Sequence, residues 1–131
     1  MPVRGIRGAT TASANTVDAI VEATGELLAE LVRLNAVDPA DVCLAYFTTT
    51  LDLDAEYPAL AARRMGWVDA PLLCGNDMAV SAPNSRAIPM CIRILLLHNT
   101  ERTQAEMKAA YLRGAQAIKA DLEKTRMEQE L

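Results

Sequence analysis

The chain has 131 residues, of which 51% are hydrophobic, and this size suits one compact domain rather than two. Thirteen Lys and Arg residues against 17 Asp and Glu residues give a net charge of −4, which argues against a surface built as a whole to bind nucleic acid. No apolar run reaches the roughly 18 residues that span a bilayer, and residues 1–11 lack the apolar region of a signal peptide. We therefore expect a cytoplasmic protein that binds neither nucleic acid nor membrane.

The first predicted elements are a strand and a long helix. Residues 3–11 alternate loosely between apolar and polar side chains, which is typical of a strand. Asn15, with Asp18 three residues later, is the expected N-cap of a helix over residues 16–34, where apolar side chains recur at spacings of three and four. This helix is expected to cover a core.

A helical turn at Asp38–Asp41, with Pro39 at its first position, precedes a predicted strand over residues 42–50. This strand shows no polar alternation, so we expect it to be covered on both faces, or covered on one face and packed on a partner with the other. A loop over residues 52–58 leads to a short helix over residues 58–65, which Gly66 ends.

The second half of the chain is predicted to supply two strands and a helix. Pro71 interrupts a strand over residues 68–74 and places it at a sheet edge or a bulge, and residues 75–77 form a turn. A loop holding Pro83, Asn84, Ser85 and Arg86 precedes a strand over residues 88–97. A capping box at Thr103–Glu106 predicts a helix to about Ala120, followed by a charged, mobile tail.

These elements predict an α+β fold, a mixed β-sheet with helices on one face. We expect a single domain over residues 1–122 and the tail over residues 123–131. The cysteines Cys43, Cys74 and Cys91 form neither a disulfide framework nor a CxxC zinc motif, so reduced thiols and no metal site are expected. The single histidine, His98, is expected to be solvated or to cap the end of a strand rather than to act in catalysis.

Two arginines in strand-like segments are the most informative residues. Arg93 lies in the apolar run of residues 90–97, and a buried guanidinium needs an anion. This anion could be an acidic side chain of the protein. Arg7 is a second strand arginine, flanked by Gly5 and Gly8, and the pair favours a pocket that binds a carboxylate.

Four segments occur in the same order and at matching spacings as in a known family. They are Arg4–Thr11 (RGIRGATT), Asp54–Ala59 with Arg63 and Gly66-Trp67, Cys91-Ile92-Arg93, and Ala110-Tyr111-Leu112. On these segments the chain resembles the monofunctional AroH-type chorismate mutases from Arg4 to about Leu122. The opening octapeptide is the most specific of the four.

The resemblance implies a homotrimer whose sheets pack into a pseudo-α/β-barrel, with helices outside and active sites between subunits. It implies that one subunit contributes Arg7, Asp77, Arg93, Tyr111 and Ile118, and that its neighbour contributes Tyr57, Ala59, Arg63, Leu73 and Cys74. The activity would be the Claisen rearrangement of chorismate to prephenate in aromatic amino-acid biosynthesis. Breaking the ether C–O bond ahead of C–C bond formation needs a compact conformer and positive charge at the ether oxygen, and no cofactor or metal.

By the same resemblance, Arg93 would stabilise the ether oxygen, and Arg7 and Tyr111 would bind substrate carboxylates. Cys74 and Asp77 would contact the ring hydroxyl, with Asp77 as the acceptor, while Tyr57 would wall the pocket and Arg63 would lie at its mouth. Plainer interpretations stay open: Tyr111 as a packing residue, Cys74 as a small buried apolar group, and Arg63 as a solvated arginine.

The chain also departs from the family pattern. Asp77 stands where a glutamate is usual, Leu60 where a lysine is usual, Lys119 where an arginine is usual, and Tyr57 where a phenylalanine is usual. Loss of a rim cation should raise KM modestly, because it weakens attraction of a dianion. We expect the activity to be retained.

Three alternatives remain on the sequence. The Asp77 loop would suit a same-fold enzyme that acts on a chorismate analogue. A trimeric module could bind dicarboxylates without turnover, and a trimeric imine-hydrolysing deaminase would also use an interface arginine, although the signature segments of that family are not visible.

Overall fold

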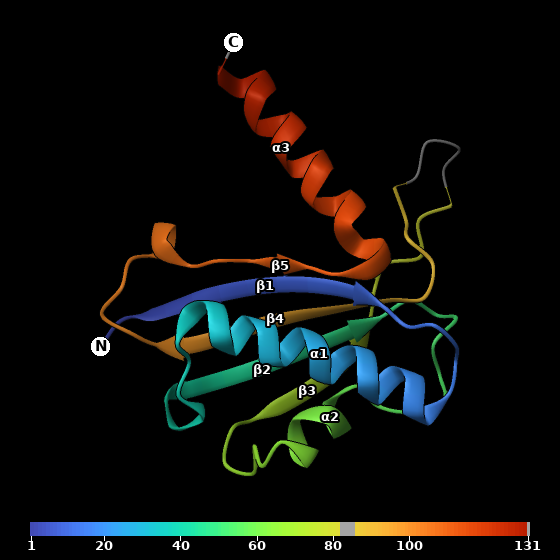
Figure 1. Cartoon of the computed structure of the whole chain (residues 1–131), viewed down its shortest axis with the longest axis horizontal. Coiled ribbons are helices and arrows are strands. Elements are labelled where there is room, and N and C mark those ends of the chain that lie inside the picture. Colours follow the sequence, from blue (N-terminus) through green and yellow to red (C-terminus); the bar gives the residue numbers. More distant parts are fainter. Residues whose placement is uncertain (82–85, 131) are drawn as a thin grey trace.

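The computed structural model describes residues 1–81 and 86–130 (Figure 1), so Pro83, Asn84 and Ser85 of the expected loop lie outside the described residues. Five strands form one sheet in the order β3-β2-β4-β1-β5. They are β1 (Val3–Thr11), β2 (Val42–Thr49), β3 (Leu72–Asn76), β4 (Cys91–Asn99) and β5 (Ala110–Tyr111). β4 runs antiparallel to β1 and β2, whereas β3 is parallel to β2 and β5 is parallel to β1. The predicted mixed sheet is confirmed.

Two helices, α1 (Val17–Asn35) and α2 (Ala59–Arg64), cover one face of this sheet. The side chains of Leu27, Leu28 and Leu31 on α1 are fully buried and pack in one cluster with Phe47 of β2 and Trp67 after α2. Each fully buried leucine stabilises the fold by about 1.5–3 kcal/mol relative to an exposed one. This layer is the main core.

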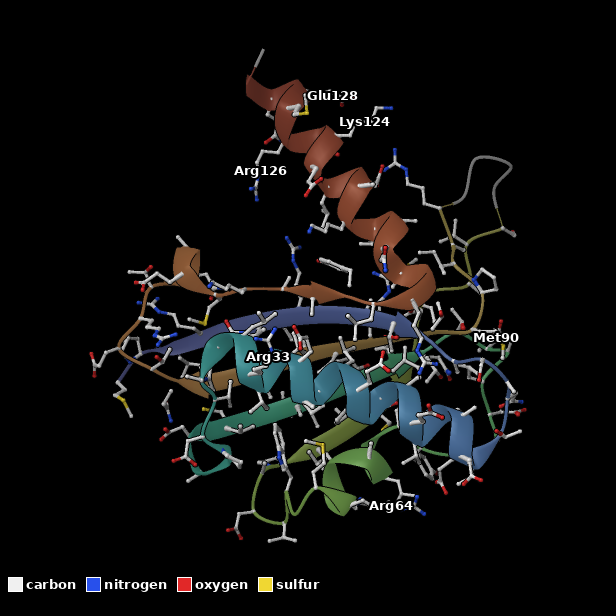
Figure 2. The ribbon with its side chains drawn as sticks, in the orientation of Figure 1. Arg33, Arg64, Met90, Lys124, Arg126 and Glu128 are labelled. Carbon is white, nitrogen blue, oxygen red and sulfur yellow. The ribbon has the colours of Figure 1, made fainter. Side chains whose placement is uncertain are left out.

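The third helix, α3 (Gln116–Glu130), begins on the other face of the sheet and then projects away from it (Figure 1). Ile118 packs against Ala9 and Cys91, whose side chains point away from α1. Lys124, Arg126 and Glu128 extend from the distal part of this helix (Figure 2). Helices therefore do not lie on one face only, which corrects the prediction for the last helix.

The face that α1 and α2 leave open is largely apolar. Val3, Leu73 and Leu95 point to this face and are 51%, 57% and 42% exposed. β2 is an inner strand, but Tyr46 and Thr48 on this face are only half-buried, so the strand is covered on one face and not on both. No helix in the described part of the chain is long and apolar enough to cross a membrane.

The last predicted helix, over residues 103–120, is wrong. The Thr103–Glu106 capping box is present, but it begins only the 3-10 turn η2 (Gln104–Glu106). Asn35 then binds the backbone N–H and C=O of Lys108, and Ala110 pairs with Gly8 as part of β5. After the 3-10 turn η3 (Arg113–Ala115), α3 continues to Glu130, through the segment expected to be a tail.

Other boundaries differ for local reasons. Thr16, not Asn15, caps α1, because Asn15 binds the backbone N–H groups of Asp54 and Ala55 instead. β3 begins only after Pro71, at the sheet edge as predicted, and it includes Gly75 and Asn76, where a turn was expected.

Further differences concern the ends of β4 and the histidine. β4 begins at Cys91 rather than residue 88 and ends at Asn99. The expectation that His98 is solvated is wrong, because its ring is buried and Nε2 lies 3.3 Å from the sulfur of Met107. The predicted turn before β2 is confirmed as η1 (Pro39–Asp41), with Asp38 as its N-cap.

Candidate active site

Strand register brings the predicted arginines into two neighbouring rows on the open face of the sheet. One row crosses all five strands through Tyr111, Ala9, Arg93, Thr48 and Gly75. The next row contains Arg7, Leu95, Tyr46 and Leu73. Residues two apart on a strand share a face, so the side chains of both rows point to the same side. Tyr111 and Gly75 lie at the two ends of Arg93's row, and Gly75 leaves the space that the hydroxyl of Tyr46 occupies.

A hollow of about 360 Å³ lies over these rows, and we call it the sheet-face hollow. It is lined by all five residues expected from a first subunit: Arg7, Asp77, Arg93, Tyr111 and Ile118. Ile118 contributes from α3 and Tyr111 from β5, and both pack against Ala9 at the floor. The hollow thus combines two cations, a carboxylate and two phenols with apolar walls, which suits an anionic ligand with an apolar ring.

Arg93 and Asp77 form an ion pair in this hollow. Nε of Arg93 donates to Oδ2 of Asp77 at 3.1 Å, and the two side chains are 46% and 20% exposed. The expectation that Arg93 is buried is therefore wrong within one chain, although its need for an anion is met. Because the contact uses Nε, the terminal amino groups of the guanidinium lie outside it. Arg93 is thus both a partner in an ion pair and a residue of the pocket, so the two interpretations of the sequence hold together.

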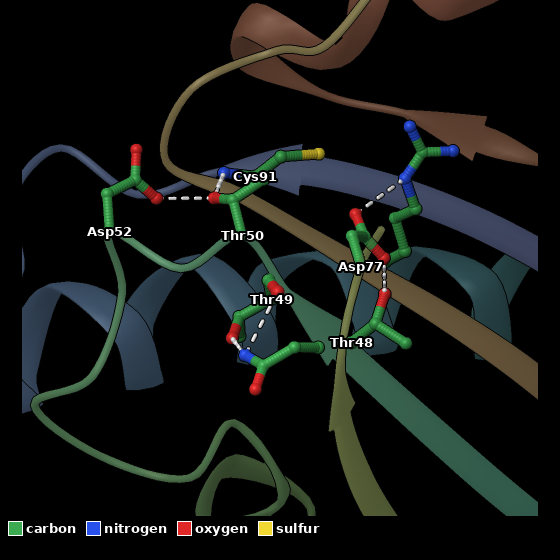
Figure 3. A network of polar contacts seen from close by, with 8 residues as sticks. Thr48, Thr49, Thr50, Asp52, Asp77 and Cys91 are labelled. Carbon is green, nitrogen blue, oxygen red and sulfur yellow. Dashed lines mark hydrogen bonds and ion pairs between the residues drawn. The ribbon is translucent and has the colours of Figure 1, made fainter. Parts of the chain in front are cut away.

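The hydroxyl of Thr48 donates to the other carboxylate oxygen of Asp77 (Figure 3). The backbone N–H of Asp77 donates to the carbonyl of Thr49 at 3.0 Å, so Asp77 continues the pairing of β3 with β2 beyond the end of β3. The sequence reasoning missed Thr48 and Tyr46, which also line the hollow. Alternation along β2 places the two on one face, but only the register with β4 places them beside Arg93.

A second polar network holds the beginning of β4 (Figure 3). Asp52 accepts from the hydroxyl of Thr50 and from the backbone N–H of Met90, and Thr50 accepts from the backbone N–H of Cys91. The Thr50 hydroxyl, followed by the Met90 N–H, lowers the pKa of Asp52, although desolvation acts in the opposite direction. This network ties the loop after β2 to the strand that carries Arg93.

The residues expected from a neighbouring subunit lie elsewhere. Tyr57 and Cys74 line a hollow of about 370 Å³ beside β3, which we call the edge hollow. Ala59 is buried at the start of α2, Arg63 is exposed on that helix, and Leu73 is exposed on the open sheet face. The edge hollow and the sheet-face hollow share no lining residue. One chain therefore does not bring the two predicted sets together.

Burial raises the pKa of the Cys74 thiol, and a backbone hydrogen bond from Ala59 and the charge of Arg63 only partly oppose this. Burial likewise raises the pKa of Cys91. Cys74 is thus a neutral thiol at neutral pH, which can donate a hydrogen bond but is a poor nucleophile.

The four residues that depart from the family pattern differ in how far they are buried. Asp77 reaches Arg93 despite its shorter side chain. Tyr57 is 68% exposed, Leu60 is half-buried on α2, and Lys119 is exposed on α3. The two positions where a lysine and an arginine are usual in the family, Leu60 and Lys119, therefore lie outside the ion pair of Arg93 and Asp77.

The chain is similar to known proteins over most of its length. A family model described as chorismate mutase type I matches residues 3–122. The chain is 40% identical over 122 residues to the chorismate mutase AroH of Thermus thermophilus, covering 92% of this chain and 97% of that protein. It is 33% identical over 127 residues to the chorismate mutase AroH of Bacillus subtilis (strain 168), covering 96% and 97%.

The fold is also found among solved structures. A chorismate mutase from Clostridium thermocellum superposes with a TM-score of 0.79 at 42% sequence identity, covering 86% of this chain and 97% of that one. With a family match over nearly the whole chain, and relatives at this identity over nearly their full length, the chain belongs to the chorismate mutase type I family.

Proposed function

We propose that this protein is a chorismate mutase, an isomerase that rearranges chorismate to prephenate in the sheet-face hollow. The observation that carries the proposal is the ion pair of Arg93 and Asp77, which shares one hollow with Arg7 and Tyr111 in a chain that matches the family over residues 3–122. No atom of the protein needs to form a covalent bond with the substrate, because the rearrangement is unimolecular.

Catalysis then depends on conformer selection and on fixed charge. Arg7 binds a carboxylate of the dianion from one row, and Tyr111 donates its phenol O–H to a carboxylate from the end of the other row. The apolar walls, including Ile118, hold the ring and exclude water. Together these contacts favour the compact conformer in which the two reacting carbons meet.

Arg93 supplies the charge that acts on the transition state. Breaking the C–O bond ahead of C–C bond formation leaves electron density on the ether oxygen, and a guanidinium beside it stays charged at any working pH. Asp77 holds Arg93 at Nε, so the amino groups keep their direction, and the carboxylate retains lone pairs that can accept from the ring hydroxyl. Since the charge develops only in the transition state, this interaction raises kcat more than it lowers KM.

A direct assay tests the activity. Purified protein is incubated with chorismate, loss of the diene absorbance is followed, and the product is identified as prephenate. Arg93→Ala should lower kcat by about 10² to 10³-fold or more. Arg33→Ala, which removes an exposed arginine paired with Glu30 on α1 (Figure 2), should leave kcat unchanged.

Two other outcomes would overturn the proposal. Turnover of a chorismate analogue but not of chorismate would assign the site to a related enzyme on the same fold. Binding of dicarboxylates by the folded protein without product would assign it to a binding module.

The site is further proposed to form between the subunits of a homotrimer in the cytoplasm. Support comes from the exposed apolar side chains of the open sheet face, and from the separate locations of the sheet-face and edge hollows. In a cyclic assembly, the edge hollow of one copy can complete the sheet-face hollow of the next. Three free thiols suit a reducing compartment.

Mixing two impaired variants tests the shared site. Arg93→Ala damages the sheet-face set and Arg63→Ala damages the edge set, so after subunit exchange about a quarter of interfaces would combine two intact sets. Activity in the mixture should exceed that of either variant alone. No such gain after exchange, verified by mass-tagged subunits, would place each site within one chain.

A further inference from the structure

Thr48 occupies an inner position of the sheet beside the proposed catalytic pair. It lies directly opposite Arg93 on β4 and opposite Gly75 on β3, and its side chain is half-buried on the open face. Its hydroxyl donates to one carboxylate oxygen of Asp77, while Nε of Arg93 donates to the other (Figure 3). The carboxylate is therefore held from two sides by two different strands.

This arrangement restricts a side chain that would otherwise turn freely. Asp77 follows the last residue of β3, where its backbone N–H still binds the carbonyl of Thr49. The backbone is thus fixed, but an aspartate carboxylate rotates easily about its terminal bond. Thr48 is β-branched and therefore stiff at χ1, so its hydroxyl is a rigid donor for this carboxylate.

We propose that Thr48 is a positioning residue of the site. Its hydroxyl orients the Asp77 carboxylate, and this carboxylate in turn orients the Arg93 guanidinium toward the substrate. The inference rests on the proposed function, because it assigns Thr48 a part in that reaction. It implies that Thr48 affects the rate without contacting the reacting atoms.

The kinetic test removes the hydroxyl and keeps the shape. Thr48→Val should lower kcat about tenfold while KM changes less than about twofold, because a charge-assisted hydrogen bond is lost and Arg93 acts mainly on the transition state. Thr48→Ser, which keeps the hydroxyl, should restore kcat to within about threefold of the parent. The matched control is Thr10→Val, the same exchange in β1 on the opposite face of the sheet, which should leave kcat and KM unchanged.

A double-mutant cycle separates positioning from direct contact or misfolding. In an Asp77→Ala background there is no carboxylate to orient, so Thr48→Val should cause no further loss of kcat. An equal tenfold loss in both backgrounds would overturn the proposal. So would a Thr48→Ser protein as slow as Thr48→Val.

A measurement without substrate keeps this inference separate from the proposed function. The Nε–H proton resonance of Arg93, assigned by its absence in Arg93→Lys, reports the contact with Asp77. Its exchange with water should become faster in Thr48→Val and stay as in the parent in Thr48→Ser and Thr10→Val. If the parent does not convert chorismate but this pattern holds, the proposed function fails, and only the orientation of Arg93 by Asp77 and Thr48 stands. If the parent converts chorismate but exchange and kcat are unchanged in Thr48→Val, the positioning role fails alone.

Discussion

The hydroxyl of Thr10 is fully buried on β1, and among residues 1–81 and 86–130 it has no hydrogen-bond partner. A buried hydroxyl without a partner costs about 1–3 kcal/mol. Thr10→Val replaces it with a methyl group of similar shape and should raise the free energy of unfolding by about 1 kcal/mol. Urea unfolding of both proteins at one protein concentration measures the difference. A loss of stability would mean that the hydroxyl is satisfied in solution.

His98 gives the protein a stability that depends on pH. Burial lowers the pKa of its ring, and the charge of Arg102 adds to this, while Asp41 opposes it. Below about pH 6.5, the unfolded chain therefore binds a proton at His98 more tightly than the folded chain does. The free energy of unfolding falls as the pH falls through this range.

The slope of the free energy of unfolding against pH measures the effect of His98. Urea unfolding between about pH 7 and pH 5 should show stability falling by up to about 1.4 kcal/mol per pH unit, and His98→Leu should flatten this part of the curve. Carboxylates titrate mainly at lower pH, so they contribute little here. An unchanged slope in His98→Leu would show that another group is responsible.

At the scale of elements, the sequence predicts what local pattern decides. The apolar stripe of α1, the turn at Pro39 and the apolar strand β2 all lie where the pattern places them. The failures occur where tertiary contacts override a local signal. The capping box at Thr103 is intact, yet Asn35 and Gly8 hold the following residues extended.

The residues of the candidate site likewise divide into those that the sequence pattern reveals and those that depend on strand pairing. Arg7 and Arg93 stand out in the sequence, because guanidinium groups within apolar strands need an anion. Thr48 does not stand out, because a threonine in a strand is ordinary and its role depends on a register of β2 with β4 across more than forty residues. The location of Asp77 follows likewise from pairing at the end of β3, where the sequence suggested a turn.

Gly75 illustrates how closely two strands of the site pack. A Cβ atom added there would collide with the hydroxyl of Tyr46 and lie 3.3 Å from its Cζ. Gly75→Ala should displace the Tyr46 ring into the sheet-face hollow and lower kcat/KM for chorismate by about tenfold, equivalent to ~1.4 kcal/mol. Steady-state kinetics measures this.

Two further variants test the cause. Tyr46→Leu in the Gly75→Ala background should recover part of the lost kcat/KM, because the colliding phenol is gone. Gly25→Ala, where a Cβ meets nothing within 4 Å on α1, should stabilise the protein by roughly 0.5–1 kcal/mol without changing the kinetics. Unchanged kcat/KM in Gly75→Ala would mean that the strands separate without disturbing Tyr46.

At the scale of the molecule, the fold is held together without the distal part of α3. Residues 123–129 are exposed along their whole length, whereas Ala115 is buried and Ile118 packs against the sheet. A chain that ends at Leu122 should therefore keep its Tm within about 2 °C of the parent, and this result would support the prediction of a domain over residues 1–122.

The matched control ends at Gly114 and removes Ala115 and Ile118 from the cluster around Ala9 and Cys91. Its Tm should fall several times further than the Tm of the chain that ends at Leu122, as calorimetry would show. Equal Tm values for the two truncated chains would mean that the first turns of α3 contribute nothing to the fold. A large loss on ending at Leu122 would instead place the distal helix within the domain.

The position of β4 in the sheet has a consequence for how the protein is made. Among the described strands, β1 pairs with β4 and β5, which lie at Cys91–Asn99 and Ala110–Tyr111. As the nascent chain leaves the ribosome, β1 emerges before both of these strands and remains without them until at least Cys91 has been translated. α1 can form early from local contacts, but Arg7, the first of the site's charged residues to be translated, reaches its place among the last.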